Sequence, residues 1–191
     1  MAMARPLDPD IDRAITGTTL RLLRERGFAR MSVEAVASEA GVGKPAIYRR
    51  HADKAALVAA VIDSQLPALE VPDMGDSRAE LWYAVETGFP EDGAAYVGLI
   101  GGLIAEQERH PELIAAFRRS VLLPRRAIVQ GLIERAQARG DLRTDIEPEA
   151  ALDLLAGPLL ARVFAGVDTG PTWRARAFET WWGMVAERSS P

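Results

Sequence analysis

The chain has 191 residues with no cysteine, only two histidines, and 23 basic residues of which only Lys44 and Lys54 are lysines. The absence of cysteine excludes disulfides and thiolate metal sites, and it fits a reducing compartment. No apolar run approaches the roughly 18 residues that would indicate a membrane span. The first ten residues also lack the apolar core of a signal peptide. We therefore expect a soluble cytoplasmic protein that carries no metal and no cofactor.

Residues suited to catalysis are equally scarce. Catalysis requires convergent histidine, cysteine or carboxylate groups, and His51 and His110 are the only histidines. The chain has no phosphate-binding glycine loop and no HExxH or GxSxG motif. His110 precedes Pro111 in an expected turn, where a solvated side chain is ordinary. We predict no catalytic residue and no enzyme activity.

Charge is distributed unevenly along the chain. The formal net charge is −4, but residues 1–66 hold 10 basic and 8 acidic side chains (net +2), and residues 67–191 hold 13 and 19 (net −6). This asymmetry predicts a nucleic-acid-binding module joined to a domain with another role. Residues 67–76, with two prolines and a glycine, are the expected linker.

Helix signals dominate the sequence, and strand signals are nearly absent. Asp8, Ser32 and Asp53 are typical N-cap residues, and Pro9 suits a first helical turn. Further helices are expected at about 77–89, 95–109, 111–119, 121–139, 147–166 and 171–188, with a break at Pro124. The first helix should end at Gly27 and bury a face made of Ile11, Ile15, Thr18 and Leu22. We predict an all-α fold of about nine helices.

Residues 32–57 contain two short helical patterns joined by Gly41-Val42-Gly43. A helix-turn-helix needs a tight turn and a second helix that can enter the major groove of DNA. Arginine can bond guanine with two hydrogen bonds, tyrosine can reach a phosphate or a thymine methyl, and Lys54 suits a phosphate. Ile47 is expected to face inward. The side chains expected outward or flanking are Lys44, Ala46, Tyr48 and Arg49.

The stretch AVASEAGVGKPAIYRRHADKAALV resembles the signature of the TetR family of transcriptional regulators, and the resemblance covers about residues 11–62. It implies an N-terminal DNA-binding domain at 1–66 and a C-terminal domain at 67–191 that dimerises and binds a small effector. The chain departs from the family at Gly43, His51 and Ala52. The family alignment implies DNA contacts from Ser32, Lys44, Pro45, Ala46, Tyr48, Arg49, Arg50 and Lys54.

The last two expected helices carry apolar stripes that suit a dimer interface. In the family the corresponding helices pair with those of a second subunit as a four-helix bundle, and large aromatic side chains are enriched in interface cores. The alternative is that the tryptophans fill the core of the monomer. The predicted interface residues are Leu155, Leu159, Val163, Trp173, Phe178, Trp181 and Trp182.

An apolar cavity with a few polar groups would serve as an effector site. Because tryptophan and tyrosine carry polar ends, we expect a ligand of mixed apolar and polar character. Core packing explains the same residues equally well. The residues expected to line it are Trp82, Tyr83, Phe89, Tyr96, Glu106 and Phe117.

Together these patterns predict a homodimeric regulator that binds a roughly palindromic double-stranded operator and is released from it by an unidentified small molecule. Repression is the usual outcome in the family. The alternative is a helical sensor or interaction protein that does not read a DNA sequence. Salt-sensitive binding to DNA duplexes separates the two hypotheses.

Overall fold

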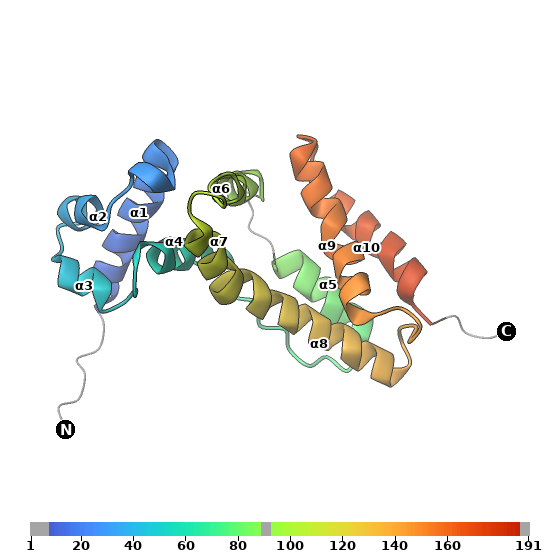
Figure 1. Ribbon diagram of the computed structural model, residues 1–191. Coiled ribbons are helices and arrows are strands. Elements are labelled where there is room, and N and C mark those ends of the chain that lie inside the picture. The colour runs from blue at the N-terminus through green and yellow to red at the C-terminus, as the bar shows by residue number, and fades with distance from the viewer. Residues whose placement is uncertain (1–7, 89–92, 188–191) are drawn as a thin grey trace, which may run out of the picture. The chain divides into compact units, whose positions relative to one another are not determined.

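The computed structural model describes residues 8–88 and 93–187, which form an all-α fold without a strand (Figure 1). Counting the contiguous α7, η1 and α8 as one, these residues contain nine helical runs, as predicted. Within the same residues, no helix is both long and apolar enough to span a bilayer. The helices are α1 (Pro9–Arg30), α2 (Val33–Glu39), α3 (Lys44–Tyr48), α4 (Lys54–Asp63), α5 (Ser77–Thr87), α6 (Gly93–Ala105), α7 (Pro111–Phe117), the π-helix η1 (Arg118–Leu122), α8 (Leu123–Arg139), α9 (Pro148–Phe164) and α10 (Pro171–Val185).

The chain divides into two compact units. The first comprises the described parts of residues 1–65 and 98–121, and the second those of 66–97 and 122–191. The first division falls beside the expected domain boundary at residue 66. Residues 98–121, however, belong to the first unit although they lie within the expected C-terminal domain. The assignment of 1–66 and 67–191 as functional domains stays a prediction.

The three predicted N-caps are confirmed. The side chain of Asp8 accepts a hydrogen bond from the amide of Asp10 at 3.0 Å, Ser32 accepts from Ala35 at 3.1 Å, and Asp53 accepts from Ala56 at 2.7 Å. Each bond satisfies an amide at a helix start that has no partner within the helix. These caps fix where α1, α2 and α4 begin.

In the first unit, α4 packs against α1 and α7, and α2 packs against α1 and α3. The expected face of α1 is confirmed at Ile15 and Leu22, which are buried. Ile11 and Thr18 are only half-buried, and Thr19 is fully buried in place of Thr18. The helical period explains the difference: Thr19 lies four residues after Ile15 and three before Leu22, on the same face. The buried residues of α1 are Ile15, Thr19, Leu22, Leu23 and Phe28. Gly27, with φ of 70°, interrupts this helix near its end.

The predicted break at Pro124 is wrong, because residues 111–139 are helical throughout. Pro124 lies in the first turn of α8, directly after the wide turn of η1. Proline lacks an amide hydrogen and its ring disfavours the normal helical bond to the preceding turn. A local π-helical turn accommodates such a disruption and lets the helix continue.

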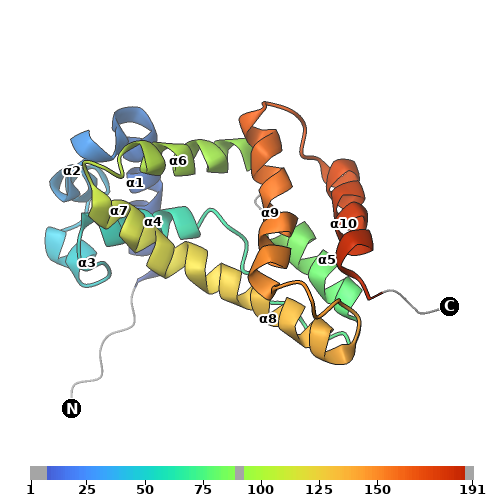
Figure 2. The same ribbon diagram turned by 45° about the vertical axis from the view of Figure 1, so that its right-hand side comes forward.

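In the second unit, α10 lies beside α9 and also packs against α5 (Figures 1 and 2). Trp181 is 2% exposed, and its indole Nε1 donates to the carbonyl of Ala151 on α9 at 2.9 Å. Phe178 is 3% exposed, and its ring packs against the rings of Trp82, Trp181 and Trp182. Helix α10 therefore supplies much of the core of this unit.

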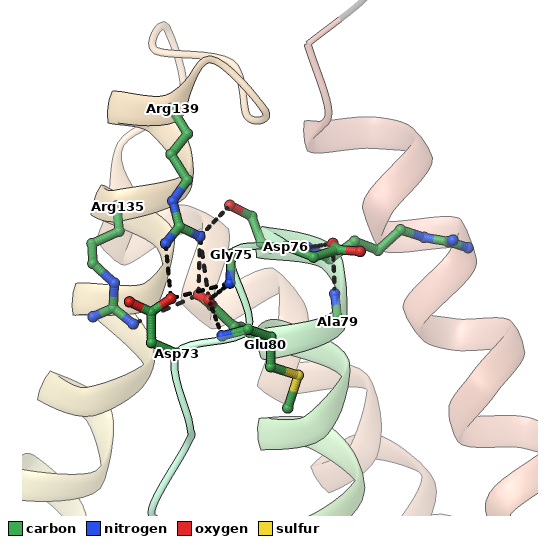
Figure 3. A network of polar contacts seen from close by, with 10 residues as sticks. Asp73, Gly75, Asp76, Ala79, Glu80, Arg135 and Arg139 are labelled. Atoms are coloured by element: carbon green, nitrogen blue, oxygen red, sulfur yellow. Dashed lines mark hydrogen bonds and ion pairs between the residues drawn. The ribbon is translucent and has the colours of Figure 1, made fainter.

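The expected linker at 67–76 contains no helix, but it is fastened to the second unit. Leu69 belongs to the hydrophobic core there. Glu80, whose side chain is 1% exposed, accepts hydrogen bonds from the amides of Met74 at 2.9 Å and Gly75 at 3.1 Å. Arg139 donates to the same carboxylate at 3.2 Å from α8 (Figure 3). This buried carboxylate ties the segment to α5 and α8.

Candidate nucleic-acid interface

The turn between α2 and α3 has the predicted geometry. Gly41 adopts φ of 68°, a left-handed conformation that glycine reaches without strain. Val42 then donates its amide to the carbonyl of Ala37 at 2.9 Å, which closes the end of α2. Gly43 is the N-cap of α3 and provides no side-chain bond, as its lack of a hydroxyl implies. The turn brings the first residues of α2 and α3 close together.

Helix α3 presents three of the expected side chains to solvent. Tyr48 is 49% exposed, and Lys44 and Arg49 are also exposed. Ile47 is 1% exposed and anchors the helix in the core, as predicted. A short helix with one apolar face inward and basic and aromatic residues outward suits insertion into the major groove.

Lys44 is paired with an acid that the sequence did not single out. Its Nζ donates to Oε1 of Glu34 in the first turn of α2 at 2.7 Å. The side chains are 52% and 58% exposed. Lys44 lowers the pKa of the Glu34 carboxyl, chiefly through this hydrogen bond, and Glu34 raises the pKa of Lys44. Both groups are therefore charged at neutral pH.

Two expected contact residues face the protein interior. Ala46 was expected outward or flanking, but it is 8% exposed because it lies beside Ile47 on the inner side of α3. The Arg50 side chain is 6% exposed. It donates to the carboxylate of Asp12 on α1 and to the carbonyl of Ala46 at 3.0 Å. The guanidinium of Arg50 is thus held within the protein, and a DNA contact from this residue stays a prediction.

Lys54 also binds within the protein. Its Nζ donates to the carbonyls of Phe28 at 3.0 Å and Met31 at 3.2 Å, where α1 ends. The same ammonium lies 4.0 Å from the centre of the Phe28 ring, which also packs edge-on against His110. A cation at a helix C-terminus satisfies carbonyls that lack helical partners. This geometry gives Lys54 a capping role that sequence spacing could not reveal.

Ser32 and Pro45 are the other predicted contact positions, and His51 is a position where the chain departs from the family. Ser32 uses its hydroxyl as the cap of α2, and Pro45 is exposed in the first turn of α3. His51 is half-buried, and burial, reinforced by nearby Arg50, lowers its pKa. Whether Ser32 and Pro45 contact DNA stays a prediction.

The second unit contains a pocket of about 230 Å³. Both apolar and polar side chains line it, and such a combination can bind a small molecule. One nitrogen of Arg174, Nε, is buried without a hydrogen-bond partner among the described residues. The lining residues are Gly93, Tyr96, Val97, Leu159, Val163, Asp168, Thr169, Gly170, Pro171 and Arg174.

Among the residues expected to bind a ligand, Tyr96 lines this pocket. Trp82 instead packs on the core of the second unit, with its ring 5.3 Å from that of Phe178. Tyr83 is half-buried on α5 and does not line the pocket. Glu106 and Phe117 belong to the first unit, where Phe117 is 5% exposed, and Phe89 lies outside the described residues.

The predicted dimer residues are mostly covered within the chain. Phe178 and Trp181 are core residues, and Leu155 and Trp182 pack partly against the same core. Leu159 and Val163 line the pocket, and Trp173 packs under the guanidinium of Arg162 at 4.7 Å. Helix α10 packs against α5 and α9. The burial of Phe178 and Trp181 therefore agrees with the alternative that these aromatic side chains fill the core of the monomer.

A different face of α9 is open. Phe164 is 72% exposed and Leu154 is 51% exposed, and the exposed residues between them on the same side include Gly157, Pro158 and Ala161. Their spacing of three or four residues places them on one helical face. On α10, Met184 is 50% exposed and lies next to exposed Gly183.

Comparison with known proteins agrees with this architecture. Residues 15–61 match the family described as bacterial regulatory proteins, tetR family, and residues 71–179 match the tetracyclin repressor-like C-terminal domain. The HTH-type transcriptional regulator YdeS of Bacillus subtilis is 30% identical over 166 residues, which cover 86% of this chain and 83% of that protein. The DNA-binding transcriptional repressor TetR of Mycobacteroides abscessus is 28% identical over 155 residues, 80% of this chain and 82% of that protein.

A crystal structure of a TetR family transcriptional regulator from Pseudomonas syringae shares the fold. Its TM-score is 0.64 with 18% identity, covering 95% of this chain and 99% of that one. The N-terminal and the C-terminal parts of the sequence therefore both match domains of tetracycline-repressor-like regulators. The chain belongs to the TetR family of helix-turn-helix transcriptional regulators.

Proposed function

We propose that this regulator is a homodimer that represses transcription by binding a roughly palindromic operator through α3 of each subunit. The observation that carries the proposal is the outer face of α3, where Lys44, Tyr48 and Arg49 are exposed while Ile47 anchors the helix. Two-fold symmetry presents two such helices, and their separation must match the spacing of the half-sites. Repression is the usual outcome in this family, and one relative is named a repressor.

A second copy of the chain is the proposed occupant of the exposed face of α9 and α10. Phe164, Leu154 and Met184 are large apolar side chains at least half exposed, and small residues between them allow close helix packing. Removing such apolar area from water favours association. Membership in a family whose last two helices pair between subunits supports the same occupant.

The pocket in the second unit is the proposed effector site. Val97, Leu159 and Val163 offer apolar contacts, and Nε of Arg174 is a buried donor without a partner in the part of the chain that the structure describes. A ligand with an apolar body and a polar acceptor suits this combination. Ligand binding shifts operator affinity only by the preference of the ligand for one conformation of the dimer, and DNA must change ligand affinity by the same factor.

Binding of the purified protein to random-sequence duplexes, followed by selection of a preferred site from a random pool, tests the function. The expected result is salt-sensitive binding and a selected motif with two-fold symmetry. No binding at low ionic strength would instead support the alternative of a helical sensor that does not read DNA. That alternative gains some support from Arg50 and Lys54, whose cationic groups bind within the protein.

The effector site is tested by screening small molecules for release of labelled operator and repeating the screen with Leu159→Trp, which fills the pocket. Effectors that act through the pocket lose their effect on the variant. Leu123→Trp, at a 54% exposed position on α8 outside the pocket, is the matched control and should leave release unchanged. Equal release from Leu159→Trp and the unmodified protein would place the effector elsewhere.

A further inference from the structure

The ion pair between Glu34 and Lys44 brings a hydrogen-bond donor and an acceptor side by side on the DNA-facing side of the helix-turn-helix. Nζ of Lys44 and Oε1 of Glu34 are 2.7 Å apart. Lys44 lies in the first turn of α3 and Glu34 in the first turn of α2. Both side chains are half exposed, so their outer edges are open to a third group.

A G·C base pair presents the complementary pattern in the major groove. Guanine O6 is an acceptor and the N4 amino group of cytosine is a donor. These two atoms are hydrogen-bonded to each other within the base pair, so they lie about 2.9 Å apart. The spacing of acceptor and donor on the DNA therefore nearly equals the spacing of donor and acceptor on the protein.

We propose that Glu34 and Lys44 act together as a specificity-determining pair that reads one G·C base pair in each half-site. Lys44 donates to guanine O6 and N7, and Glu34 accepts from the N4 amino group of cytosine. The two side chains bind without separating, so the ion pair is kept in the complex. This inference rests on the proposed DNA binding and adds the residue pair that fixes one position of the operator.

Other base pairs fit this pair less well. Reversing the pair to C·G places the cytosine donor against the ammonium and the guanine acceptor against the carboxylate, so both contacts become repulsive. A T·A pair offers an acceptor and a donor in the right order, but the thymine methyl takes the place of guanine N7 beside the ammonium. We therefore expect G·C in one orientation, with T·A as the next preference.

Arg49 also faces solvent, but it follows the last residue of α3, whereas Lys44 is the first. The other charged groups nearby are held by partners within the protein. Arg50 binds Asp12, and Lys54 binds the end of α1. Glu39, the second acid of α2, pairs with Arg21 and Arg26 of α1. An acid facing DNA without a donor to contact would repel the phosphates, so Glu34 also penalises sites that offer it no amino group at that position.

Site selection with Glu34→Ala, Lys44→Ala and Glu39→Ala tests the proposal. Glu39→Ala is the matched control, because it removes the same charge from the same helix but breaks the ion pairs with Arg21 and Arg26 and leaves the one with Lys44 intact. The unmodified protein and Glu39→Ala should select one fixed G·C column in each half-site. Glu34→Ala and Lys44→Ala should both weaken the preference at that column and keep the others. Thermal unfolding of each variant confirms that it is folded.

Binding to matched duplexes gives the magnitude. Reversing that single G·C pair to C·G should weaken the unmodified protein about tenfold or more, and Glu34→Ala less than about threefold. If Glu34→Ala tightens binding to every sequence equally and selects the same motif, Glu34 is only a charge near phosphates and the proposal is wrong. If the unmodified protein selects no motif at all, the proposed function fails first.

Discussion

Arg50 and Asp12 join α3 to α1 through an ion pair between guanidinium and carboxylate. The Arg50 side chain is 6% exposed, whereas Asp12 remains 45% exposed. Arg50 lies in the turn directly after α3, and a second bond from its guanidinium to the carbonyl of Ala46 ties it to that helix. Arg50 therefore sets the position of α3 on α1, while its neighbour Arg49 faces solvent.

Replacing Arg50 with methionine should therefore destabilise the protein. The change removes charge-assisted hydrogen bonds and should lower the free energy of unfolding by about 2 kcal/mol. Arg49→Met, at an exposed position, should change it by less than about 0.5 kcal/mol. Urea unfolding of both variants measures the difference. Equal stability of the two would show that the contact between Arg50 and Asp12 contributes nothing to folding.

Lys54 gives a second prediction because capping and phosphate binding have different signatures. Lys54→Met should lower the free energy of unfolding by about 2 kcal/mol, since it removes two bonds from a charged donor and a cation–π contact. The salt dependence of DNA binding should stay unchanged, because no phosphate contact is lost. Arg49→Met serves as the comparison and should make the slope of log K against log salt concentration shallower by about 0.9.

The same measurements on Lys54→Met would also detect a phosphate contact by Lys54. A slope reduced by about 0.9 with unchanged stability would restore the phosphate contact that the family alignment implies. Urea unfolding and anisotropy titrations at several salt concentrations distinguish the two cases in one set of samples.

The sequence predicts structural features correctly where a few neighbouring residues determine them. The caps at Ser32 and Asp53 and the left-handed turn at Gly41 depend on their own side chains and backbone. It does not predict the contacts of Arg50 and Trp181, whose partners lie 38 and 30 residues away. The sequence around an arginine or a tryptophan gives no local signal of whether a distant helix covers its side chain, so the burial of these two side chains could not be predicted.

His51 makes stability depend on pH. Its folded-state pKa lies below the ordinary value of 6.5, mainly because burial disfavours the charged ring. The unfolded chain therefore binds more protons than the folded one between these two values, and stability rises with pH across that window. The contribution is complete above about pH 6.5 and is lost as pH falls from there toward the folded-state pKa.

Comparison with His51→Gln isolates this effect. The difference in unfolding free energy between the unmodified protein and the variant should shrink as pH is lowered from about 8 to 5. Urea unfolding at each pH gives the free energies, and a proton NMR titration of the His51 ring gives the pKa directly. Parallel pH profiles for the two proteins would show that burial of His51 has no energetic consequence.

Phe164 tests where the second subunit binds. In a two-fold interface every substitution occurs twice. Replacing the 72% exposed ring of Phe164 with glutamate places two charges in the proposed interface and should raise the dimer dissociation constant by about 100-fold or more. Analytical ultracentrifugation of Phe164→Glu should show monomers at concentrations where the unmodified protein is a dimer. Operator affinity should fall as the dimer dissociates, because one helix-turn-helix cannot contact both half-sites.

Leu123→Glu adds the same charge at a 54% exposed position on α8 and should remain dimeric. If Leu123→Glu dissociates and Phe164→Glu does not, the subunits associate through α8 and not through the open face of α9.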